Sequence, residues 1–66
     1  MNPAEVASTL RELASLARTL QQHLRRILQS GSVGELAARL TLERAATQLE
    51  TLAAKADTLA EFMERP

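Results

Sequence analysis

The chain has no cysteine, tryptophan or tyrosine, and its 66 residues include one phenylalanine, two glycines and two prolines. Without cysteine no disulfide can form, and a single histidine cannot supply the usual ligand set of a structural zinc ion. A chain this short buries little apolar surface alone, so it needs cross-links, a metal or association. Because the first two are excluded, we expect it to associate with another chain.

Neither an excess of one charge nor a long apolar run is present. Eight basic and eight acidic side chains give a formal net charge of zero, which lacks the positive field typical of proteins that bind nucleic acids or anionic membranes. No apolar run approaches the roughly 18 residues that span a bilayer, and residues 1–8 do not resemble a signal peptide. We expect a soluble, cytoplasmic protein with no membrane partner. Arginine outnumbers lysine seven to one, which suggests a GC-rich bacterial or phage genome.

Leucine and alanine supply most of the hydrophobic residues, while β-branched and aromatic residues are scarce. This composition favours helices over strands. The sequence therefore predicts an all-α fold with a single domain over residues 1–66. We expect an antiparallel helical hairpin with a helix at about 3–29, a turn at 30–34 and a helix at about 35–64.

The predicted helix ends depend on local capping signals. Asn2 can cap the first helix, Pro3 suits its first position, and Glu5 stands where a capping box requires it. Gly31 is typical of the residue that ends a helix. Ser32 is the expected cap of the second helix.

Each predicted helix carries an apolar seam with alternating steps of four and three residues. The first seam is Val6, Leu10, Leu13, Ala17, Leu20, Leu24 and Ile27. The second is Leu42, Ala45, Leu49, Leu52, Ala56, Leu59 and Met63. Because the connection is short, the two seams should pack together as antiparallel, coiled-coil-like neighbours. We expect two such hairpins to dimerise into a four-helix bundle.

The charges support the same alignment. If the hairpin folds about Gly34, each of three arginines comes level with a carboxylate: Arg11 with Asp57, Arg18 with Glu50, and Arg25 with Glu43. Five alanines lie between these two stripes, where they leave room for the long charged side chains to reach across: Ala7, Ala14, Ala46, Ala53 and Ala60.

Two large apolar residues, Leu16 and Phe62, fall outside the seams, on the side away from the alanines. A ligand-binding slot is one interpretation of this position. We favour a second packing surface, where another hairpin or a different protein binds.

Val33, Leu36 and Leu40 lie near the turn and point away from the second seam. They could fold over the end of the first helix and close the turn. Alternatively they could form an apolar surface for a partner, since exposed leucine clusters otherwise promote aggregation. The sequence is consistent with both interpretations. Together with Leu16 and Phe62, these residues are the candidate partner-binding set.

No residue pattern indicates catalysis. His23 has no second histidine, cysteine or carboxylate pair at a suitable spacing, and the two glycines are turn residues and not a phosphate-binding loop. We therefore expect no enzyme activity, no metal or other cofactor, and no small-molecule substrate. Arg25, Arg26 and Arg39 near the turn leave RNA binding as a minor possibility, although no aromatic platform for bases is present.

The most consistent function is a small protein-binding module, such as an adaptor, co-chaperone or inhibitor, that presents helix faces to a partner protein. In size and hairpin outline the sequence is similar to the small helical co-chaperones of bacterial type III secretion needle subunits and to many phage-encoded inhibitors. That similarity implies a protein partner and assigns no residues. The alternatives are a purely structural homo-oligomer and an RNA-binding helical hairpin dimer.

Overall fold

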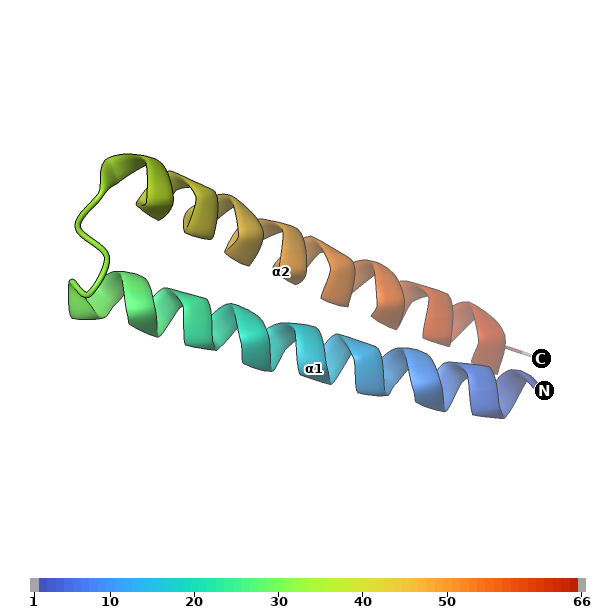
Figure 1. The fold of residues 1–66 in the computed structure, drawn as a ribbon. Coiled ribbons are helices and arrows are strands. Elements are labelled where there is room, and N and C mark those ends of the chain that lie inside the picture. Colours follow the sequence, from blue (N-terminus) through green and yellow to red (C-terminus); the bar gives the residue numbers. More distant parts are fainter. Residues whose placement is uncertain (1, 66) are drawn as a thin grey trace.

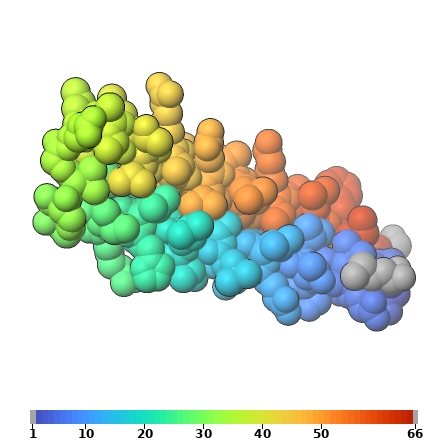
Figure 2. Space-filling model, viewed as in Figure 1, coloured from blue at the N-terminus to red at the C-terminus, as the bar shows by residue number. Residues whose placement is uncertain are grey.

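The computed structural model describes residues 2–65 as two antiparallel α-helices joined by a short turn (Figure 1). Helix α1 runs from Pro3 to Ser30 and helix α2 from Leu36 to Glu64. The Cα atoms span 49 × 15 × 14 Å, so the molecule is a rod, and side chains fill the space between the helices on the side shown in Figure 2. The predicted all-α helical hairpin is confirmed, with helix bounds within one residue of those expected.

Both ends of α1 follow the sequence signals. The side chain of Asn2 accepts a hydrogen bond from the backbone N–H of Glu5 at 2.9 Å, and Pro3 is the first helical residue. At the other end Gly31 adopts φ 75°, in the left-handed region that a residue with a Cβ enters only at a steric cost. Gly31 therefore ends the helix as predicted.

The start of α2 differs from the prediction. Glu35 occupies the N-cap position without a side-chain capping bond, and the helix begins at Leu36. Ser32 lies too far before this start to reach the first free N–H groups of the helix, so its predicted role as the cap is wrong. Its hydroxyl instead lies 2.5 Å from that of Ser30.

Arg39 ties the turn to the end of α1. Its Nη1 donates to the backbone carbonyl of Leu28 at 3.3 Å and to that of Val33 at 3.1 Å. The Leu28 carbonyl is among the last four of the helix, which have no helical N–H partner. The hydroxyl of Ser30 donates to another of them, the Ile27 carbonyl, at 2.8 Å. The side chains of Arg39 and Ser30 thus supply hydrogen-bond donors to two of the free carbonyls at the end of α1.

The fully buried part of the contact between the helices is almost entirely alanine. The buried residues in the described part of the chain are Ala7, Ala14, Ala17, Leu28, Ala46, Ala53, Ala56 and Ala60. Ala46, Ala53 and Ala60 have no exposed surface at all. Because the distance between two packed helices depends on the side chains at their contact, rows of methyl groups allow the backbones to approach closely.

This contact corrects the predicted seams. Leu13, Leu20, Leu52 and Leu59 were expected to face the other helix, but each is at least half exposed. Each helix is rotated about its axis relative to the prediction. The alanine rows, which were expected beside the contact, therefore lie in the contact itself. Two further seam residues, Ile27 and Met63, are 41% exposed. The other seam positions are buried or half-buried at the contact: Val6, Leu10, Ala17, Leu24, Leu42, Ala45, Leu49 and Ala56. The physical reason is that alanine rows give a closer fit between two helices than rows of leucine do.

The charged stripes lie together as expected, but their partners differ. Three ion pairs link the helices: Arg11 with Glu64, Arg18 with Asp57 at 2.5 Å, and Arg25 with Glu50 at 3.7 Å. Each carboxylate lies seven residues beyond the one predicted. Side chains on a helix tilt toward its N-terminus. In antiparallel helices the arginine and the carboxylate therefore tilt in opposite directions, so an arginine meets a carboxylate whose Cα lies further along the rod and not at its own level. The hydrogen bond from Arg11 to Glu64, together with that carboxylate's charge, raises the pKa of Arg11 above its ordinary value.

The alanine contact can be tested by overpacking. Ala53→Leu should destabilise the protein by about 1–3 kcal/mol, because its extra atoms have no space between the helices. In a domain of this size that lowers Tm by about 4–8 °C per kcal/mol. The control Ala54→Leu changes the next, exposed residue and should leave thermal melting nearly unchanged. Equal tolerance of both substitutions would contradict this contact.

The ion-pair partners can be tested by reversing charges. Arg18→Glu should lower Tm at low salt, because it places a carboxylate beside Asp57. Adding Asp57→Arg should restore stability, whereas adding Glu50→Arg, at the partner expected from the sequence, should restore less. Stronger rescue by Glu50→Arg would show that the level alignment of charges is the correct one.

Candidate protein-binding surface

Six of the ten exposed large apolar side chains in the described chain form one surface. They are Leu13, Leu20 and Ile27 on α1 and Leu52, Leu59 and Met63 on α2, each 41–56% exposed. We call these six residues the leucine face. Leu13, Leu20 and Ile27 are seven residues apart, as are Leu52 and Leu59, so each set runs along one side of its helix.

Helix geometry places both sets on the same side of the hairpin. On α1, Leu13 precedes the buried Ala14 by one residue and Arg18 follows it by four, which puts them on opposite sides of Ala14 at about 100° per residue. On α2, Leu52 and Asp57 have the same offsets from the buried Ala53. Because the helices are antiparallel and face each other, the leucine rows emerge together on one side and the ion pairs on the other.

The leucine face lies within a wider strip that contains no polar residue. Four rows of seven-residue spacing make up the strip: 6, 13, 20 and 27; 10, 17 and 24; 42, 49, 56 and 63; and 38, 45, 52 and 59. Every position in these rows is Val, Leu, Ile, Met or Ala. A continuous exposed apolar patch on a small protein marks a site of interaction.

Two of the predicted site residues border the leucine face. Leu16 is 67% exposed and follows Leu13 by three residues, while Phe62 is 61% exposed and follows Leu59 by three. Residues at this spacing are neighbours on a helix surface. The guanidinium of Arg65 lies over the Phe62 ring, 5.0 Å from its centre. The sequence therefore indicated the margin of the face, but it assigned the central leucines to the contact between the helices.

The other predicted site residues lie elsewhere. Leu36 and Leu40 are 70% and 50% exposed, and Val33 is half-buried. Leu36 and Leu40 therefore do not close the turn, which Arg39 secures instead. Leu40 adjoins Arg44 on the outer side of α2. The structure thus does not bring the three turn residues together with Leu16 and Phe62.

The exposure of Leu36 and Leu40 predicts that stability does not depend on them. The double variant Leu36→Ala, Leu40→Ala should stay within about 0.5 kcal/mol of the parent protein, as substitutions at exposed sites usually do. Buried leucines would cost ~2–5 kcal/mol each. Thermal melting distinguishes these outcomes, and a collapse of Tm would assign both residues to the core.

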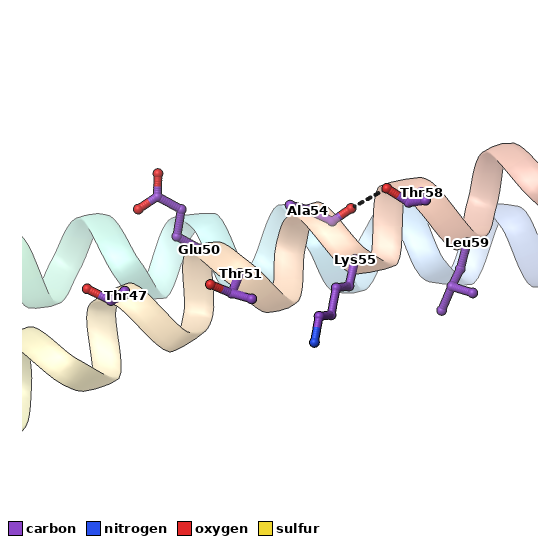
Figure 3. Close-up of a pocket in the computed structure, with 7 residues that line it drawn as sticks. All are labelled: Thr47, Glu50, Thr51, Ala54, Lys55, Thr58 and Leu59. Carbon is purple, nitrogen blue, oxygen red and sulfur yellow. Dashed lines mark hydrogen bonds between the residues drawn. The ribbon is translucent and has the colours of Figure 1, made fainter.

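A shallow hollow runs along the outer side of α2 (Figure 3). Its lining is Thr47, Glu50, Thr51, Ala54, Lys55, Thr58 and Leu59. The Thr58 hydroxyl donates to the Ala54 carbonyl at 3.0 Å, so it is already engaged within the helix. Since all these residues belong to one helix, the hollow has no opposing wall and lacks the enclosure of a small-molecule site.

The polar residues considered from the sequence are dispersed or engaged within the chain. His23 is exposed, and residues 2–65 contain no group of three or more His, Cys, Asp or Glu residues that could hold a metal ion. Arg25 pairs with Glu50, and Arg39 donates to backbone carbonyls. The basic residues considered for RNA binding are thus partly occupied by contacts inside the hairpin.

In the described part of the chain, neither helix combines the length and the apolar character needed to cross a bilayer. No protein-family model, characterised protein or solved structure matches the chain. Its structure defines a class, the antiparallel helical hairpin with one uncharged face.

Proposed function

We propose that this chain is a protein-binding module, acting as an adaptor, co-chaperone or inhibitor, that presents the leucine face to helices of another polypeptide. Two partner helices laid on this face would complete a four-helix bundle. The observation that carries the proposal is the uncharged strip of four heptad rows on the side of the hairpin opposite its ion pairs. The proposal includes the cytoplasmic location expected from the sequence and assigns no catalytic activity.

The energetics favour a partner that is itself apolar. Fully burying a Leu, Ile or Met side chain contributes ~1.5–3 kcal/mol, and about half of each of the six side chains remains exposed. Covering the face therefore gains on the order of 5–9 kcal/mol from this chain, comparable to the ~4–15 kcal/mol cost of association. An equally apolar partner surface doubles the gain and makes binding favourable.

The alternatives use the surface differently. An RNA-binding hairpin would depend on the arginines, three of which already pair with carboxylates of the same chain. A purely structural homo-oligomer would use the same leucine face and bind no other protein. The identity of the molecule bound at this face therefore separates the two protein-based functions.

Site-specific photo-crosslinking tests the proposal. A photoreactive phenylalanine derivative replacing Leu20 should form adducts with a protein in the cells that express the chain, because it lies in the leucine face. The same group at the exposed Thr47, on the outer side of α2, serves as the control and should form few adducts. If position 20 yields no adduct with this chain or any other protein, the proposal is wrong.

A further inference from the structure

We infer that, while no other protein is bound, the leucine face is covered by a second copy of this chain, which lies face to face with the first and has its turn at the opposite end. This inference rests on the proposed function, because it uses the same face. It goes further by naming the partner and its orientation.

A single hairpin contains only part of a core. Seven of the eight buried residues in the described chain are alanine, and Leu28 is the one large side chain among them. Six leucine-face side chains of the kind that ordinarily fill a core stay outside. The chain has no disulfide to compensate. A second copy supplies an identical half, so that the two faces enclose one core of large side chains.

The size of the face fits a stable dimer. The Cα atoms of the hairpin extend over 49 Å by 15 Å. One side of such a rod offers about 700 Å² per copy, so two copies cover about 1,400 Å² together, within the ~1,200–2,000 Å² of specific protein interfaces.

The charges also fit a second copy. The arginine and carboxylate stripes pair within one hairpin, on the side away from the leucine face. The four rows of the strip offer no charge with which to select a partner of opposite sign. An uncharged face is complemented by another uncharged face, as in the self-complementary interface of a two-fold dimer.

The order of small and large residues along α2 sets the orientation. Its outer row is Ala38 and Ala45 near the turn and Leu52 and Leu59 toward the open end. With the turns at opposite ends, α2 lies antiparallel on α2 of the other copy, so Ala38 meets Leu59 and Ala45 meets Leu52. Pairing small with large residues lets two surfaces interdigitate without voids.

The opposite arrangement, with both turns at one end, fits less well. In it, α2 of one copy lies on α1 of the other, whose row is Val6, Leu13, Leu20 and Ile27. With the turns at opposite ends that row lies on itself and meets large residues along its whole length, whereas with both turns at one end it would meet alanines near the turn and leucines at the open end. The two layers would then be held at unequal distances along the rod.

Sedimentation equilibrium of the purified chain at micromolar concentration should give twice the chain mass of 7.2 kDa. The variant Leu20→Glu, Leu52→Glu should give one chain mass, because it buries charges in the interface. The control Thr19→Glu, Thr51→Glu makes the same charge change at the neighbouring exposed residues and should stay dimeric. A dimer retained by the first variant, or lost in the control, would overturn the inference.

A measurement on the unaltered protein covers the case in which the glutamate variant does not fold. The Tm of a dimer rises with protein concentration, so a constant Tm together with a single chain mass would overturn the inference. If position 20 then forms photo-adducts with other proteins, the protein-binding function stands and only the second copy is excluded. If it forms none, both proposals fail.

The orientation has its own measurement. A nitroxide attached at Ser32→Cys, in the turn, should report a distance between copies close to the 49 Å length of the rod. Turns at the same end would give a far shorter distance, across the width of the bundle. That result would overturn the proposed orientation.

Discussion

Alanine methyl groups fill the buried centre of the contact between α1 and α2. They determine the rotation of each helix about its axis as well as the spacing between the axes. Ala14 and Ala53 are buried at the centre of the contact. Their burial fixes on which side of the hairpin the neighbouring residues of each helix lie. Leu13 and Leu52 emerge on one side, and Arg18 and Asp57 on the other. The separation of apolar and charged surfaces follows from this rotation.

The same rotation of the helices places all three ion pairs on one side of the hairpin. Exposed ion pairs contribute little to stability individually, and these pairs are well exposed. Their effect is to pair three arginines with three carboxylates of the same chain, along a single side. The leucine face carries no charge, so an interaction there depends on shape and apolar area and not on charge.

The sequence predicted the helices and the turn because the signals are local. Asn2 and Gly31 act through their own backbone and the next few residues. It did not predict which row forms the contact, because Leu13 and Ala14 belong to neighbouring rows with the same seven-residue spacing. Periodicity cannot choose between a row that buries more surface and a row that allows closer approach. The leucine face was missed for this reason, although its margin at Leu16 was recognised.

Each helix carries more apolar rows than one neighbour can cover. On α1 the three adjacent rows are 6, 13, 20 and 27; 10, 17 and 24; and 7, 14, 21 and 28, apolar throughout except for Gln21. On α2 they are 38, 45, 52 and 59; 42, 49, 56 and 63; and 39, 46, 53 and 60, apolar throughout except for Arg39. A helix in a hairpin has one neighbour, whereas a helix in a four-helix bundle packs against two. The width of the apolar stripe therefore suits a second neighbour for each helix, and the row of large residues is the one left to meet it.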